Sequence, residues 1–201
     1  MGNAPMVDAM ISDALWDIFN DYHMGITAEN VCEKWKISRD ELDEFSVNSQ
    51  KKAEKAIEEG RFRDEIVSVE ISQKKDVAIF NVDEGPRAGV TVESLARLKP
   101  AFKKNGIVTA GNSSGINDGA AAVVLVSEDK IKKLGLEPMA EWLGGALGGV
   151  DPSIMGVGPI ESTKKLFAKL NIKMDDIDLI EANEAFAAQS IAVERELKIP
   201  K

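Results

Sequence analysis

Apolar residues recur at helical spacing in several parts of the chain. Residues 6–20 carry them at Met6, Met10, Leu15, Ile18 and Phe19, a spacing that predicts a helix. The stretch "SRDE" at 38–41 has the form of a capping box, and the apolar positions that follow it predict a helix of about five turns that ends at Gly60. Further helices are predicted near 27–35 (after a turn around Gly25), 91–98, 128–135 (closed by Gly135), 159–170 and 184–197.

Other apolar runs have the length and pattern of strands. Residues 65–71 and 77–82 alternate between apolar and polar side chains and flank a basic turn at Lys74 and Lys75. Residues 107–110 are expected to enter a glycine-rich turn as a strand. Continuous apolar runs predict further strands at 120–126, 139–150 and 176–182. From about residue 120 these strands alternate with helices, which predicts a mixed or parallel α/β sheet.

Composition and charge narrow the class of protein. The chain has 201 residues and a formal net charge of -9, which argues against a nucleic-acid or anionic-membrane binder. No apolar run reaches the roughly 18 residues of a membrane span. Acidic residues interrupt the apolar N-terminus, so no signal peptide is expected there. The single cysteine, Cys32, excludes an internal disulfide and fits a reducing cytoplasm. We therefore expect a soluble, cytoplasmic protein.

Two features could be either structural or functional. "GNSSG" at 111–115 could be a plain tight turn, or a loop whose backbone and hydroxyl groups lie against a ligand. The one imidazole, His23, is by base rate more often a packed residue than a catalyst. With one histidine, no Ser–His triad can be assembled with confidence. No second His or Cys stands at metal-ligand spacing, so no metal site is expected.

A lone amide between an apolar strand and an apolar helix is the third such feature. Asn183 could be the N-cap of the helix, with Glu184 as its first residue, or an amide in an oxyanion hole. Spacing alone favours the cap. Met155, in a glycine-rich loop, could fill a packing gap or form a soft wall for an acyl group. Cys32 has no neighbour that would lower the pKa of its thiol, so we interpret it as structural.

Four stretches, taken together, resemble one family. They are "YHMGITAENV" (22–31), "KPAFKKNGIVTAGNSSGINDGAAA" (99–122, with Lys99 where the family usually has Arg), "DPSIMGVGPI" (151–160) and "IEANEAFAAQ" (180–189). In this order they resemble the thiolases of the biosynthetic type, which form acetoacetyl-CoA. The resemblance implies an α/β, thiolase-like fold: partial mixed sheets with covering helices, plus an inserted α+β loop domain.

The resemblance also implies roles for individual residues. Asn183 would hold a water that helps form an oxyanion hole, and Arg87 would lie near the adenine-phosphate end of CoA. His23 and Met24 would line the pantetheine and thioester channel. Ser114, with Gly115 behind it, would hydrogen-bond the pantetheine amide; Ser113 replaces the usual Ala beside it. Apolar or small residues would form walls around the pantetheine and acyl pocket: Leu15, Phe102, Met155, Ala185 and Phe186.

The departures from the family concern its catalytic groups. The nucleophilic cysteine of the family lies upstream of these motifs, and its "GHPIG" histidine and "CxGGG" cysteine lie downstream. None of them occurs here, and Cys32 matches neither cysteine. The chain therefore resembles an internal fragment: a CoA-binding loop domain (1–116), the end of the N-terminal core domain (117–137) and the first part of the C-terminal core domain (138–201).

The function implied by the resemblance is that of an acyltransferase. The complete enzyme would condense two acetyl-CoA to acetoacetyl-CoA, or run the reverse thiolysis, with CoA as a substrate and no metal or bound cofactor. Its usual assembly would be a homotetramer. The chain by itself would be inactive. The alternative is a non-catalytic, thiolase-like CoA-binding or assembly module.

Overall fold

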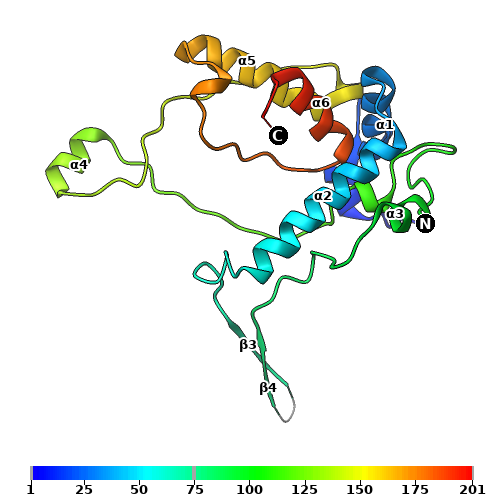
Figure 1. The fold of residues 1–201 in the computed structure, drawn as a ribbon, viewed down its shortest axis with the longest axis horizontal. Coiled ribbons are helices and arrows are strands. Elements are labelled where there is room, and N and C mark those ends of the chain that lie inside the picture. Colours follow the sequence, from blue (N-terminus) through cyan, green and yellow to red (C-terminus); the bar gives the residue numbers. More distant parts are fainter. Residues whose placement is uncertain (1, 74–75, 201) are drawn as a thin grey trace.

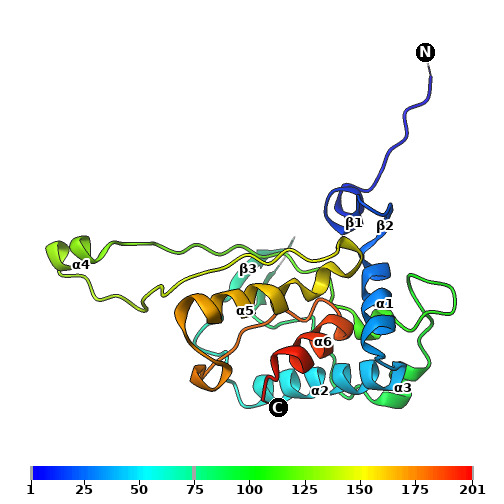
Figure 2. The same ribbon diagram turned by 90° about the horizontal axis from the view of Figure 1, so that it is seen from above.

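Three helices and a short helical turn enclose the main core. The computed structural model describes residues 2–73 and 76–200. Helices α1 (Met24–Trp35), α2 (Arg39–Glu58) and α6 (Ala187–Leu197) pack together with the 3-10 turn η3 (Pro152–Val157), as Figures 1 and 2 show. Their shared core contains Val31, Leu42, Val108, Ala188 and Ala192, all nearly inaccessible to solvent. Segments from both ends of the sequence therefore build one core.

Local signals in the sequence set the ends of these helices. The predicted capping box is confirmed: Ser38 Oγ accepts a hydrogen bond from Glu41 N (3.2 Å), and Glu41 Oε2 accepts one from Ser38 N (2.9 Å). The hydrogen bond from the Ser38 backbone is the main reason that the pKa of Glu41 is lowered. Gly60 follows the helix with a positive φ of 65°, which glycine adopts without steric cost.

Apart from the helix predicted over 6–20, the other predicted helices are also present, with small shifts at their ends. Helix α3 (Val92–Ala96) is capped by Thr91, and α4 (Glu128–Leu134) ends at Gly135 in the left-handed conformation. Pro159 stands in the first turn of α5 (Gly158–Leu170), where its missing N–H costs nothing. Two further 3-10 turns are η2 (Ala110–Asn112) and η4 (Met174–Asp176).

The β-sheet structure of the described residues consists of two small antiparallel hairpins. Strand β1 (Trp16–Asp17) pairs with β2 (Tyr22–His23). Strand β3 (Val69–Ser72) pairs with β4 (Val77–Phe80), which confirms the predicted pair of strands, and this hairpin projects from the body in Figure 1. The predicted basic turn at Lys74 and Lys75 lies outside the described residues.

The prediction of one helix over 6–20 is wrong. Residues 9–10 are helical and continue into the π-helix η1 (Ile11–Leu15), after which the chain enters β1. The side chain of Asp17 explains the break. Its carboxylate accepts hydrogen bonds from Phe19 N (2.9 Å) and from Asn20 Nδ2 (2.7 Å), and this local alternative competes with helical hydrogen bonding.

The strand predictions for residues 107–110, 120–126, 139–150 and 176–182 are also wrong for the described residues. Residues 107–110 carry the chain into η2. The other three segments belong to no strand and are irregular, apart from Asp176 at the end of η4. The long excursions on either side of α4 run clear of the helical core in Figures 1 and 2. Their apolar side chains are exposed, for example Val124 at 89% and Leu147 at 92%. A strand forms only when a neighbour completes its hydrogen bonds, and no described segment lies in place to do so. No described helix is both long and apolar enough to cross a bilayer.

Candidate functional site

A cleft of about 510 Å³ brings two of the sequence motifs together. One wall is formed by α2, with the half-buried side chains of Ser49 and Gln50. The opposite wall is the glycine-rich turn at 111–115, and residues 182–184 close a third side. Ser113, Ser114, Gly115 and Asn183, all predicted site residues, therefore line one hollow.

Backbone pairing holds the glycine-rich turn against the segment that precedes α6. Ser114 N donates a hydrogen bond to Ala185 O (2.9 Å), and Ser113 forms an isolated antiparallel bridge with Phe186. Ser114 is exposed beside the cleft, and its hydroxyl donates to Gly115 O (2.9 Å). The motifs "GNSSG" and "NEAF", which lie far apart in the sequence, thus form a single continuous surface.

Three aromatic rings extend this surface. His23 stacks on Phe102 with 4.7 Å between ring centroids, and Phe102 meets the edge of Phe186 at 6.0 Å. Gly25 permits this contact, because a Cβ atom there would lie 2.1 Å from the Phe102 ring. Three residues predicted to line one channel therefore form one cluster.

His23 also has a structural role. Its Nδ1 accepts a hydrogen bond from Gly25 N (3.0 Å) and so caps α1. Burial lowers the pKa of the imidazole from its ordinary value of 6.5. The neutral ring is thus the form that the fold favours, because a protonated Nδ1 could not accept the hydrogen bond from Gly25.

The interpretation of Asn183 as a helix cap is wrong. Phe186 is the N-cap of α6, and Glu184 lies before the helix rather than at its first position. Gln189 causes the difference: its Oε1 accepts from Phe186 N (2.8 Å) and its Nε2 donates to Asn183 O (2.9 Å). The Glu184 carboxylate accepts a hydrogen bond from Ser49 Oγ (2.6 Å). The Asn183 side chain has no hydrogen-bond partner among the described residues, and Asn183 lines the cleft.

Other predicted site residues lie outside the cleft. Leu15 is half-buried in η1, and Met155 is 48% exposed on η3. Met24 is the half-buried first residue of α1. Arg87 is exposed near the rim, where its backbone N donates to Gln50 Oε1 (2.9 Å). The described residues do not gather Leu15, Met155 and Arg87 into the hollow that contains Asn183.

Buried polar residues behind the site were not predicted. The carboxylate of Glu29, 3% exposed on α1, accepts hydrogen bonds from the backbone N atoms of Ile107 and Val108. Asp43 and Asn112 form a second buried pair. The sequence "TAGN" at 109–112 has cap residues at both ends and could have indicated the turn, because Thr109 and Asn112 form a capping box. No pattern in the sequence singles out Glu29 or Asp43.

Metal and thiol chemistry have no visible centre in this part of the chain. Across residues 2–73 and 76–200, no group of three or more His, Cys, Asp or Glu side chains is placed to hold a metal ion. Cys32 is 3% exposed, and burial, helped by the charge of Glu29, raises the pKa of its thiol to about 12. This agrees with the interpretation of Cys32 as a structural residue.

The stability of the fold should depend on pH through His23. In the folded protein the pKa of His23 lies below its ordinary value of 6.5. The contribution of His23 to the free energy of unfolding is therefore complete above pH 6.5 and is lost as the pH falls through the folded pKa, because the unfolded chain then binds the proton more readily. The lowered pKa values of Glu41 and Asp151 act only below their ordinary values of 4.5 and 3.8. Urea unfolding between pH 7 and pH 5 should therefore show a loss that His23→Gln removes. Equal pH slopes in both proteins would contradict this.

Comparison with known protein families gives two matches that divide the chain. The thiolase N-terminal domain matches residues 1–129, and the thiolase C-terminal domain matches residues 136–201. The acetyl-CoA acetyltransferase of Pseudomonas aeruginosa is 58% identical over 198 residues, which are 98% of this chain and 50% of that protein. A probable acetyl-CoA acyltransferase of Staphylococcus aureus is 56% identical over 201 residues, 100% of this chain and 51% of that protein.

Solved structures of this family have the same arrangement. The acetyl-CoA acetyltransferase of Bacillus anthracis superposes with a TM-score of 0.90 at 46% identity, over 100% of this chain and 50% of that one. Human mitochondrial 3-ketoacyl-CoA thiolase superposes with a TM-score of 0.90 at 42% identity, over 99% of this chain and 50% of that one. The predicted α/β, thiolase-like fold class is confirmed, although the chain spans about half the length of these relatives. From both family matches and these structures, the chain belongs to the thiolase family.

Proposed function

We propose that residues 1–201 are the CoA-binding part of a thiolase that condenses two acetyl-CoA to acetoacetyl-CoA or runs the reverse thiolysis. The observation that carries this proposal is the 58% identity, over almost the whole chain, to a protein named acetyl-CoA acetyltransferase. The contact between "GNSSG" and "NEAF" supports it, because Ser114 N and Ala185 O join the two motifs to which the roles are assigned.

The proposed roles follow the surface described above. The aromatic cluster of His23, Phe102 and Phe186, with Met24 and Leu15 nearby in sequence, would form the apolar wall for the pantetheine arm. Ser114 would hydrogen-bond its amide, with Ser113 and Gly115 shaping the turn and Ala185 holding it. Arg87 would meet the phosphates, and Met155 would face the acyl group.

The proposed chemistry assigns one catalytic role to this chain. In the complete enzyme a cysteine thiolate takes the acyl group and the CoA thiolate leaves, so negative charge develops on the thioester oxygen. An amide that holds a water against this oxygen stabilises the transition state more than the substrate. We assign that amide to Asn183, whose side chain has no partner among the described residues and which lines the cleft. CoA is the substrate carrier, and no metal or bound cofactor takes part.

Domain organisation and assembly are part of the same proposal. Residues 1–116 would be the loop domain, 117–137 the end of the N-terminal core domain and 138–201 the first part of the C-terminal core domain. The complete enzyme would be a cytoplasmic homotetramer, with no nucleic-acid or membrane partner. The exposed apolar side chains of 120–126 and 139–147 support a larger assembly, because they would be buried once neighbouring strands pair with them.

One observation favours the alternative function for this stretch taken alone. Its single cysteine is buried with a thiol pKa of about 12, so this stretch offers no reactive thiol for the acyl transfer. Residues 1–201 by themselves would then be a CoA-binding or assembly module.

Calorimetric titration of CoA into residues 1–201 tests the proposal. We expect a dissociation constant of about 0.1–1 mM, or about 4–5.5 kcal/mol, because the groups from outside the chain are missing. Arg87→Ala and Ser114→Ala should each weaken binding, whereas Arg61→Ala should not, since Arg61 pairs with Glu59 away from the cleft. Binding should also weaken as salt rises, because the phosphate contacts would be exposed.

Two results would contradict these assignments. The first is equal binding of CoA to both site variants and to the unaltered chain. The second is that 3′,5′-adenosine diphosphate binds as tightly as CoA. This nucleotide lacks the pantetheine arm that Ser114 and the aromatic cluster are proposed to hold.

A further inference from the structure

We infer that Asp43 is a positioning residue, which sets the shape of the 111–115 turn through Asn112 and so fixes one wall of the cleft. The inference rests on the proposed function for its ligand, a CoA thioester. Its geometric part, the control of the turn by a buried carboxylate, stands on contacts within the described residues.

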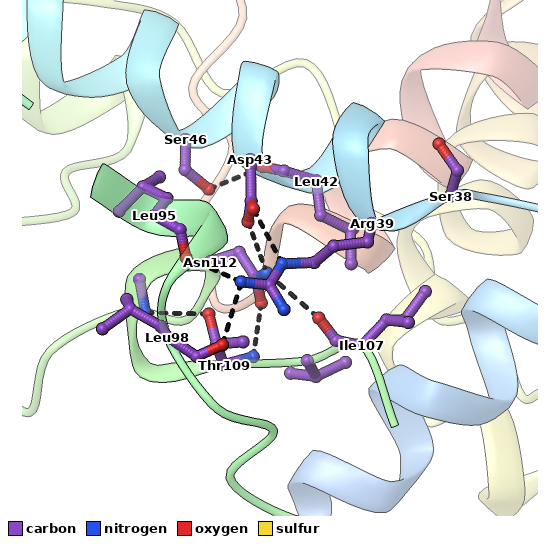
Figure 3. Close-up of polar contacts among 12 residues, drawn as sticks. Ser38, Arg39, Leu42, Asp43, Ser46, Leu95, Leu98, Ile107, Thr109 and Asn112 are labelled. Carbon is purple, nitrogen blue, oxygen red and sulfur yellow. Dashed lines mark hydrogen bonds and ion pairs between the residues drawn. The ribbon is translucent and has the colours of Figure 1, made fainter. Parts of the chain in front are cut away.

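Asp43 is the buried centre of a polar network that Figure 3 shows. Its side chain, on α2, is 1% exposed. Asp43 Oδ1 accepts a hydrogen bond from Asn112 Nδ2 (3.0 Å), and Asp43 Oδ2 accepts one from Arg39 Nε (2.7 Å). Both oxygens therefore act as acceptors toward side chains of different elements, a task that an ionised carboxylate performs and an amide cannot.

Asn112 passes this constraint to the turn. Its Oδ1 accepts from Thr109 N (2.8 Å), and its Nδ2 also donates to Ile107 O (3.2 Å). Thr109 in turn accepts from Ser113 Oγ at its carbonyl (2.7 Å) and from Gly111 N at its hydroxyl (3.2 Å). The acceptors on Asp43 thus determine which way the Asn112 amide points, and the amide determines the path from 107 to 113.

Arg39 adds a second support behind the same turn. Its Nη2 donates to Leu95 O (2.7 Å) and to Leu98 O (3.1 Å), at the end of α3. The side chains of Leu95 and Leu98 press on Gly111, where a Cβ atom would lie 2.6 Å from Leu98 Cδ1. The Arg39–Asp43 ion pair therefore connects α2 to the end of α3 and, through Asn112, to the turn.

The cleft connects this network to ligand binding. Helix α2 carries Asp43 and also provides one wall through Ser49 and Gln50, and the turn provides the facing wall through Ser113 and Ser114. Asp43 joins the two walls at their buried base. A change in hydrogen-bond polarity at Asp43 should displace Ser114 relative to Ala185 without altering a residue that lines the cleft, whereas Asn112 itself lies on the cleft lining.

Isosteric exchange of the two partners tests the inference. Asp43→Asn places an amide N–H against either Arg39 Nε or Asn112 Nδ2, both donors, and Asn112→Asp places two carboxylates in contact. In the double variant the amide introduced at position 43 can donate to the carboxylate introduced at position 112 and still accept from Arg39. Only the repulsion between that carboxylate and Ile107 O then remains, so partial rescue is expected. Glu58→Gln, at the exposed end of α2, is the matched control for the loss of one carboxylate.

Hydrogen exchange and CoA titration give independent readouts. Each single variant should speed amide exchange at Ser114 by about tenfold and weaken CoA binding several-fold, while amides of α6 near Ala192 stay protected. The double variant should recover most of the protection at Ser114 and most of the affinity for CoA. Glu58→Gln should change neither the exchange rate nor the affinity. Single variants that behave as the unaltered chain, or a double variant no better than the worse single one, would overturn the inference. If the unaltered chain does not bind CoA, the proposed function fails, and the exchange at Ser114 still decides the role of Asp43.

Discussion

Glu29→Ala should lower the free energy of unfolding by about 1–3 kcal/mol, because it leaves the buried N–H of Val108 without a partner; it also removes the acceptor of the half-buried Ile107 N–H. The buried Glu29 carboxylate is the acceptor for the backbone N–H groups of Ile107 and Val108, at 2.9 Å each to Oε1. The loss should appear as a lower urea midpoint of the helical circular dichroism signal.

The matched control is Glu33→Ala, on the same helix. Glu33 is exposed and pairs with Lys103 at the surface, and such pairs contribute about 1 kcal/mol or less. Gly106→Ala provides an independent check, because its Cβ atom would lie 2.1 Å from Glu29 Oε1 and would displace the carboxylate. If Glu29→Ala and Glu33→Ala were equally stable, the carboxylate would not be what holds residues 106–108 to α1.

Cys32 should react with iodoacetamide on the order of 10³-fold more slowly than an unfolded thiol at pH 8. A thiol pKa of about 12 leaves roughly one thiolate in 10⁴ at that pH, whereas a free thiol with a pKa near 8.5 is about one quarter ionised. Burial adds to the protection. Mass spectrometry of timed alkylations, with a urea-unfolded sample as control, measures the ratio.

The same property predicts the catalytic result. Residues 1–201 should cleave acetoacetyl-CoA with CoA no faster than a blank, and Cys32→Ser should leave that rate unchanged. Turnover that survives Cys32→Ser would mean that another group in this chain is the nucleophile. Turnover that Cys32→Ser abolishes would mean that the buried thiol is reactive. Either result would overturn the assignment of the nucleophile to a segment outside this chain.

Several elements follow from the sequence because their signals are local. Three of these signals each act within one turn of their own helix: the capping box at Ser38 and Glu41, Gly135 in the left-handed conformation after α4, and Pro159 in the first turn of α5. The alternating runs around β3 and β4 could also be predicted, because a hairpin pairs neighbouring segments. The four motifs, read together, identified the family, which the comparisons show.

The elements that failed depend on distant partners. The apolar runs at 120–126, 139–150 and 176–182 have strand-like composition, but a strand needs a neighbour for its hydrogen bonds, and none of the described segments supplies one. The wrong prediction for residues 6–20 has a local cause. Their apolar residues recur at helical spacing, but hydrogen bonds to the Asp17 side chain form a turn there instead of a continued helix. Apolar periodicity indicates which side chains can be buried and leaves open what buries them.

The candidate site divides in the same way. The sequence by itself determined which residue types stand at 111–115 and 183–186, and hence the chemistry that could be proposed for them. Gln189, rather than Asn183, completes the start of α6 through a hydrogen bond to Phe186, three residues away, whereas only the tertiary structure decided that Glu29 and Asp43 are buried behind the site. The burial of these two carboxylates depends on hydrogen bonds across 69 and 79 residues of chain, Asp43 with Asn112 and Glu29 with Val108. No local pattern encodes such pairs, because the cost of burying a carboxylate is offset only by partners that the fold brings to it.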